Sequence, residues 1–144
     1  MKALSLIEIF LVAAAMGIII LLTVPFGADF YSSQQLEANT VEAVQTLRRS
    51  QLKAMAQEDD SRFGVYFSQT SYTIFKGDSY AGRDPQFDEV FSLAVGVSAS
   101  GLSEVVFSKM EGKPSATGNI ILTSQRNTNT ININEVGRIS ETND

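Results

Sequence analysis

The sequence predicts an α+β fold, in which a long hydrophobic N-terminal helix packs on a C-terminal antiparallel sheet or sandwich domain. Two patterns along the 144 residues predict it. The run 9–26 contains eighteen residues without a charge, and a helix of that length spans about 27 Å. After residue 60 the apolar spacing changes from a helical period to strict alternation, which is typical of half-buried strands.

The uncharged run, IFLVAAAMGIIILLTVPF, has the length of a single membrane-spanning helix. A secretory signal peptide would have a basic start, a shorter apolar core and a small-residue cleavage site. Here Lys2 is the only basic residue before the run, and Phe26 stands where a small residue is needed. A plain membrane anchor is the simpler alternative, but neither interpretation explains the acid that precedes the run.

That acid is Glu8, one residue before the uncharged run begins. Moving a carboxylate into hydrocarbon costs about 2.5 kcal/mol or more, and such residues are functional candidates. Glu8 therefore needs either a cationic partner or a position in water at the membrane interface.

The segment KALSLIEIFLVAAAMGIIILLTVP resembles the class III signal of type IV pilins and type II secretion pseudopilins. In that family a short leader ends in Gly, an apolar residue starts the mature chain, and Glu is its fifth residue. On this pattern Ala3 stands in the place of the Gly, Leu4 becomes the N-terminus, and Glu8 is the acid. Gly17 and Pro25 occupy the positions of the family's helix-softening glycine and kink proline.

The resemblance implies a structural subunit of a pilus or pseudopilus that forms a helical homo-oligomer through its N-terminal helix. It implies cleavage after Ala3 by a prepilin peptidase, N-methylation of Leu4, and assembly by an ATPase and a platform membrane protein. The chain would cross the bacterial inner membrane once before assembly and then form an extracellular filament. Glu8 favours a repeating subunit over a tip-initiating one, while the choice between pilus and secretion pseudopilus stays open.

The charges that cleavage of this signal would create are compatible with assembly into a filament. Cleavage would expose an α-amino group at Leu4 that is cationic at neutral pH. The Glu8 carboxylate could neutralise the amine of its own or a neighbouring subunit, and an incomplete buried pair would penalise wrong registers. The small residues at 13–15 and Gly17 either let helices approach closely or merely tolerate lipid.

The stretch from Phe30 to Met55 contains neither Gly nor Pro and is predicted to continue the helix. We expect its apolar stripe to pack on the sheet, and the acidic turn 58–60 to end the helix. Basic residues in the last turns complement the helix dipole. The stripe consists of Val41, Val44, Leu47 and Met55, with Gln51 as a gap and Leu36, Ala38 and Leu52 nearby; the basic residues are Arg48, Arg49 and Lys53.

Alternating apolar residues after residue 60 predict about seven short antiparallel strands. They centre on 63–67, 72–74, 91–98, 105–107, 120–122, 131–133 and 136–139. The predicted organisation is thus a leader at 1–3, a transmembrane or filament-core helix at 4–26, an amphipathic continuation at 27–60, and a β-rich head at 61–144. The stretches RFGVYF, YTIFKG, VVFSKMEGKP, GNIILT and INEVGRIS resemble the globular domain of the pseudopilin H group.

The composition excludes several kinds of chemistry. There is no Cys, His or Trp, so disulfides, thiolate or histidine metal sites and a Ser-His-Asp triad are impossible. Carboxylate, Lys, Tyr and Ser chemistry remain open, but no constellation supports a membrane-anchored enzyme, so we predict a non-enzymatic protein without a cofactor. Asp78, Asp84, Asp88 and Glu89 could offer oxygens to a cation, although a solvated loop is the favoured interpretation. Tyr66, Tyr72, Phe75 and Tyr80 are either core and cross-strand partners, which we favour, or an adhesive face.

A different function, DNA binding by a minor pilin, would use basic residues around Gly137 and Arg138. Arg126 and Arg138 are the only basic residues after residue 113, and the net charge is −5. Phosphate binding needs clustered cations, so nucleic acid is the less favoured partner. A minor pseudopilin at the tip of a secretion pseudopilus is the other alternative.

Overall fold

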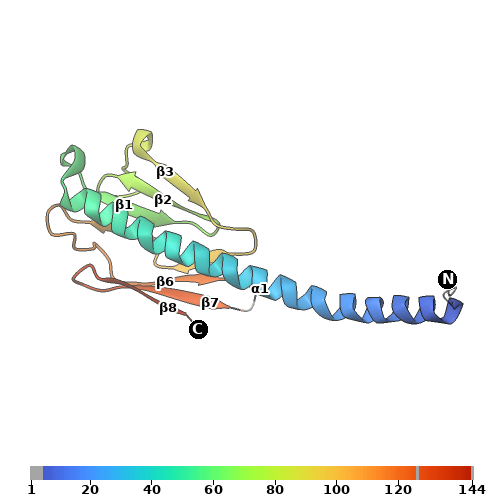
Figure 1. The fold of residues 1–144 in the computed structure, drawn as a ribbon. Helices are drawn as coiled ribbons and strands as arrows, with labels where there is room; N and C mark the ends of the chain where they lie inside the picture. The colour runs from blue at the N-terminus through green and yellow to red at the C-terminus, as the bar shows by residue number, and fades with distance from the viewer. Residues whose placement is uncertain (1–4, 126, 144) are drawn as a thin grey trace. The chain divides into compact units, whose positions relative to one another are not determined.

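The computed structural model describes residues 5–125 and 127–143, with the backbone alone described at 22–29 and 143. The chain divides into two compact units, residues 1–32 and residues 33–144. Helix α1 (Leu6–Met55) supplies the described part of the first unit and enters the second (Figure 1). The rest of the second unit consists of antiparallel strands, which confirms the predicted α+β class.

Helix α1 begins after Ser5, whose carbonyl accepts hydrogen bonds from the amides of Glu8 and Ile9 at 2.9 and 3.3 Å. The helix includes both Gly17 and Pro25. It ends at Met55, and the exposed 3-10 turn η1 (Glu58–Asp60) follows. Gln57, with φ 54°, adopts a left-handed conformation that cannot continue the helix.

Eight strands are described where about seven were expected. They form two four-stranded antiparallel sheets, a first sheet in the order β3-β2-β1-β5 and a second sheet in the order β4-β6-β7-β8. The bounds are β1 (Phe63–Phe67), β2 (Ser71–Lys76), β3 (Glu89–Ser92), β4 (Ser98–Gly101), β5 (Glu104–Phe107), β6 (Gly118–Thr123), β7 (Thr128–Ile133) and β8 (Ile139–Asn143).

The prediction of one continuous strand over 91–98 was wrong. The strand β3 ends at Ser92, a turn at Val95 and Gly96 follows, and β4 belongs to the other sheet. Val95 is 99% exposed, and Gly96 has φ +89°, a conformation that glycine adopts at little cost. Alternation of apolar residues persisted through a turn, so the pattern concealed the change of sheet. Val136, predicted in the last strand, is also exposed in a turn.

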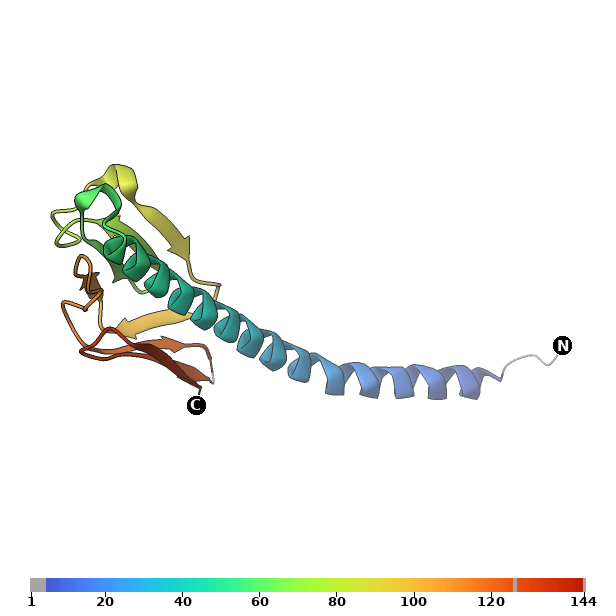
Figure 2. The same cartoon turned by 60° about the vertical axis from the view of Figure 1, so that its left-hand side comes forward.

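In the second unit, one apolar core is shared by α1 and the two sheets. Residues 33–55 of α1 lie along both sheets (Figure 2). The helix and each of the two sheets contribute buried side chains. The helix supplies Leu36, Ala43, Val44, Leu47 and Ala54; the first sheet supplies Phe63, Val65, Phe67, Tyr72, Ile74, Val105 and Phe107; the second supplies Ala99, Ile120, Leu122, Ile131, Ile133 and Ile139.

The predicted helix stripe is correct in part. Val44 and Leu47 are buried, whereas Val41 and Met55 are exposed. Small and polar residues complete the buried face instead, namely Thr40, Ala43, Ser50 and Ala54. An apolar stripe does not reveal these positions, because small and polar residues do not stand out in a hydrophobic pattern.

Polar side chains fix this part of α1 against the strands. The Asn129 amide donates to the Thr40 hydroxyl at 3.0 Å, and the Asn127 amide donates to the Ser33 hydroxyl at 2.6 Å. The Asn39 carbonyl oxygen accepts the backbone N–H of Ala94 at 3.1 Å. These bonds satisfy polar groups that would be costly to bury alone.

Among the described residues, no helix is both long enough and apolar enough to cross a lipid bilayer. Part of the span predicted within 4–26 lies outside the residues whose side chains are described.

Candidate functional site

The first unit exposes an apolar helix surface. Between residues 5 and 21, the structure leaves the large apolar side chains open to solvent. They are Leu6, Ile7, Ile9, Phe10, Leu11, Val12, Met16, Ile18, Ile19, Ile20 and Leu21. An exposed apolar surface of this extent is typical of a segment that contacts another molecule.

Glu8 lies within this surface, in the first turn of α1, where a negative charge complements the helix dipole. Its side chain is exposed and borders an open groove together with Ser5, Ile7, Leu11 and Val12. Ala3 and Leu4, the predicted cleavage and methylation residues, lie outside the described residues. The predicted Glu8–amine pair therefore stays a prediction.

Gly17 and Pro25 lie on the same helix. A Cβ atom placed on Gly17 would meet nothing within 4 Å, so contacts within this chain do not require a glycine there. The backbone at Pro25 is helical, and its side chain is outside the described set. Among the described residues, no contact therefore explains the glycine at position 17.

The acidic loop 77–89 does not gather its carboxylates. Asp84 caps η2 (Pro85–Phe87) by accepting the N–H of Gln86 at 3.2 Å. Asp78 lies 3.4 Å from the Arg62 guanidinium. Among the residues that the structure describes, no three potential metal ligands come together.

Asp88, another acid of the loop, accepts a hydrogen bond from Arg83 at 2.7 Å. This bond raises the pKa of the Arg83 guanidinium above its ordinary value. Arg83 also donates to the Tyr80 carbonyl and stacks over the Tyr80 ring, 3.8 Å from its centroid. The pair therefore organises the loop rather than a ligand site.

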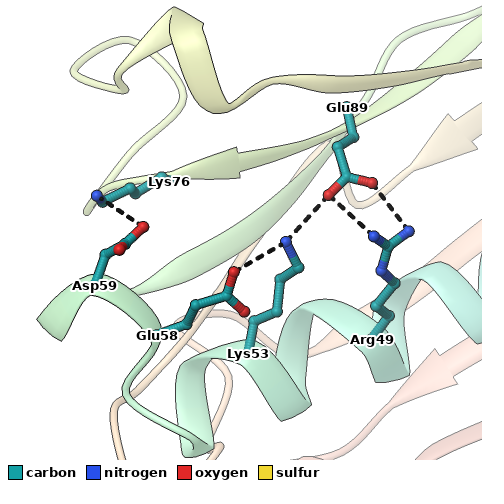
Figure 3. A network of polar contacts seen from close by, with 6 residues as sticks. All are labelled: Arg49, Lys53, Glu58, Asp59, Lys76 and Glu89. Carbon is teal, nitrogen blue, oxygen red and sulfur yellow. Dashed lines mark hydrogen bonds and ion pairs between the residues drawn. The ribbon is translucent and has the colours of Figure 1, made fainter.

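Glu89, the last acid, ties the first sheet to the end of α1 (Figure 3). Its two carboxylate oxygens accept from the Arg49 guanidinium at 2.9 and 3.2 Å, and from the Lys53 ammonium at 3.1 Å. Lys53 also lies 3.5 Å from Glu58, and Lys76 lies 3.2 Å from Asp59. Basic residues near the end of the helix thus serve tertiary contacts as well as the helix dipole.

We expect Glu89→Gln to lower the free energy of unfolding by about 1 kcal/mol, because a bidentate, partly exposed network is worth more than a single surface pair. The loss should shrink as salt is added, since salt screens exposed charges. Urea unfolding at low and high salt measures it. Glu141→Gln, an exposed strand residue, is the control, and equal effects of the two changes would refute the network's contribution.

The aromatic residues divide between the two faces of the first sheet. Tyr72 is buried in the core and stacks with Phe67 and Phe91. On the other face Tyr80 stacks on Tyr66 with centroids 4.0 Å apart and meets Phe75 edge-on. Tyr72 is a core residue and Tyr66 and Phe75 lie on paired strands, as we favoured, whereas Tyr80 lies in the loop after β2 and packs on both of them.

Burial raises the pKa of the Tyr72 hydroxyl far above its ordinary value, and the nearby Glu42 carboxylate adds to the rise. The hydroxyl therefore stays protonated and neutral at physiological pH. This is the state expected of a core residue, not of a catalytic base.

Sequence reasoning missed one polar pocket, a surface hollow of about 230 Å³ beside β5. Its charged lining is paired, because Arg62 lies 3.4 Å from Asp78 and Lys113 lies 3.1 Å from Glu111. The pairing residues are far apart in sequence at 62 and 78, so no local motif signals the pocket.

Of the two residues predicted for DNA binding, Arg138 is the one that the structure describes. Arg138 is exposed, and its backbone N–H donates to the Asn134 side chain at 2.8 Å. Arg126 lies outside the described residues. Glu135 beside Arg138 is exposed as well, and an acid there opposes phosphate binding.

No family model matches the chain, and no curated protein or solved structure is significantly similar to it. The function is therefore inferred from the residues and geometry described above.

Proposed function

We propose that this protein is a structural subunit of a type IV pilin-like filament, either a pilus or a secretion pseudopilus. The subunit would be cleaved after Ala3 by a prepilin peptidase, methylated at Leu4, and polymerised through its N-terminal helix. The role is structural and includes no catalytic step or cofactor. Before assembly, the uncharged run 9–26 would hold the subunit in the inner membrane, where an assembly ATPase and a platform protein act on it.

The exposed apolar surface of residues 6–21 is the observation that carries the proposal. Burying apolar area contributes about 25 cal/mol per Å², so packing this surface against identical helices would strongly favour assembly. Gly17 supports the same view, because no contact among the described residues requires a residue without a side chain there. The close approach of a neighbouring helix would require a residue that small.

Glu8 would set the register of that packing. It is the only charged residue between positions 5 and 21, so burial of this surface would also bury its carboxylate. A buried carboxylate needs a cation beside it, and the amine created at Leu4 would be the nearest candidate in an adjoining subunit. The long helix packed on sheets in the second unit is consistent with a pilin-like subunit.

The test is electron microscopy of sheared filaments from cells that make the Glu8→Ala protein. We expect at least about a tenfold loss of filament mass, because an unpaired buried amine costs several kcal/mol. Glu42→Ala removes an exposed acid from the same helix and should leave filaments intact.

Two results would contradict the proposal. One is a normal yield of filaments from the Glu8→Ala protein. The other is N-terminal sequencing of assembled subunits that finds Met1 in place of methylated Leu4. Immunoblots of whole cells establish that both variants accumulate to the same level.

A further inference from the structure

The outer face of the second sheet carries a regular array of uncharged polar side chains. Residues directly opposite one another in antiparallel strands share a face, and the strand register aligns ten such positions in rows. We call this set the hydroxyl–amide face: Ser98, Ser100, Asn119, Ile121, Thr123, Thr128, Thr130, Asn132, Ser140 and Thr142.

The members of this face alternate with buried residues along each strand, which shows that the face points away from the core. In β6, Ile120 and Leu122 are fully buried, while Asn119, Ile121 and Thr123 between and beside them are accessible. The same alternation holds in β7, where Ile131 and Ile133 are buried. Five members are exposed and five are half-buried; the exposed ones are Ser100, Asn119, Asn132, Ser140 and Thr142.

The array is ordered in two directions. One row crosses all four strands through Ser100, Ile121, Thr130 and Thr142. Neighbours in a row lie about 4.8 Å apart, and successive rows lie about 6.6 Å apart along the strands. The Asn132 amide donates to the Asn119 side-chain oxygen at 2.7 Å, which holds both groups in place before any ligand arrives.

Charge is nearly absent from this sheet. Glu141 is the only charged residue in the described parts of its four strands, whereas the protein as a whole has 16 acidic and 11 basic residues. A phosphate backbone or an anionic membrane would require clustered cations. A protein partner would require aromatic or arginine anchors, and Ile121 is the only large apolar member.

We infer that the hydroxyl–amide face binds a neutral polysaccharide. Hydroxyl and amide side chains both donate and accept hydrogen bonds, as sugar hydroxyls do, and a flat periodic array suits a repetitive ligand. Each contact is weak because water competes for it, so binding depends on many contacts along a polymer. The inference is independent of the filament proposal, since it uses only strands of the second unit.

The experiment measures retention of the full chain, held in polyoxyethylene detergent micelles, on four polysaccharides: microcrystalline cellulose, chitin, dextran and mannan. We expect retention on at least one of them that persists at high salt, because no ion pair contributes. DNA-cellulose compared with plain cellulose serves as the charged probe and should retain no more protein.

The variants are Thr130→Lys and Thr130→Glu, which place either charge at the centre of the face. Both should weaken retention about tenfold, because either charge loses hydration against a neutral ligand without gaining a partner. Ser92→Lys and Ser92→Glu change an exposed serine on the first sheet and should have no effect. Matched circular dichroism spectra confirm that the variants fold.

Three outcomes would overturn the inference. Retention on none of the four polysaccharides excludes a neutral glycan ligand. A loss with one charge and a gain with the other identifies a charged ligand instead. Concentration-dependent association of the unaltered protein that both Thr130 variants abolish, without polysaccharide retention, makes the face a contact between copies.

Discussion

Replacing Gly137 by alanine should lower the free energy of unfolding of the second unit by about 2–4 kcal/mol. Gly137 has φ +81°, and a Cβ atom there would lie 2.5 Å from the Gly112 carbonyl oxygen and 2.6 Å from the Gln51 side-chain nitrogen. That nitrogen donates to the carbonyls of both Gly112 and Gly137, at 2.8 and 2.9 Å. The substitution would therefore separate α1 from two loops at once.

Gly96→Ala is the matched control. Gly96 has a similar φ of +89°, but a Cβ atom there would meet nothing within 4 Å. Its cost should be only that of the left-handed backbone, about 1 kcal/mol. Urea unfolding of both variants, followed by circular dichroism, separates steric overlap from backbone strain. Equal losses of unfolding free energy in the two variants would show that Gln51 and Gly112 can move to accommodate the methyl group and that their contact contributes little stability.

Leu47→Ala should cost about 2–5 kcal/mol, because the leucine is fully buried between α1 and the sheets and its removal leaves a cavity. Leu52→Ala makes the same chemical change five residues later on the same helix. Leu52 is 63% exposed, so its loss should stay within about 0.5 kcal/mol.

Denaturation curves of the two leucine variants, recorded in the same detergent, provide the comparison. A Leu47→Ala protein as stable as the Leu52→Ala protein would mean that residues 33–55 do not pack on the sheets as described. The two leucines have equal helix propensity, so burial is the only difference under test.

Local patterns predicted the fold class and most of its elements. The alternation at Phe63, Val65 and Phe67 marked β1, and the acidic turn 58–60 placed the end of α1 within a few residues of Met55, where the helix ends. Such patterns succeed because a strand or helix that faces a core on one side must repeat apolar residues at its own period. The prediction of a strand through Val95 was wrong, because apolar and polar residues can also alternate through a turn at which the chain passes to the other sheet.

The candidate site was predictable to a smaller extent. Glu8 and the apolar run are visible in the sequence because charge and hydropathy are local properties. The partners of Glu89 were not, because Arg49 and Lys53 come from an element separated by more than thirty residues. For the acids of loop 77–89 we favoured a solvated loop over a cation site, and each acid is directed to a different neighbour.

Three features follow from the order of residues alone: the absence of histidine and cysteine chemistry, the uncharged N-terminal run preceded by Glu8, and the α+β class. Each of them depends on composition or on spacing along the chain. Three-dimensional packing determined which helix residues are buried: Val41 and Met55 face solvent, while Thr40 and Ser50 are buried. It also determined that Gln51 bridges two loops and that the polar residues of four strands align into one uncharged face. These depend on which distant segments meet, and a linear pattern does not specify contacts between residues that are far apart in sequence.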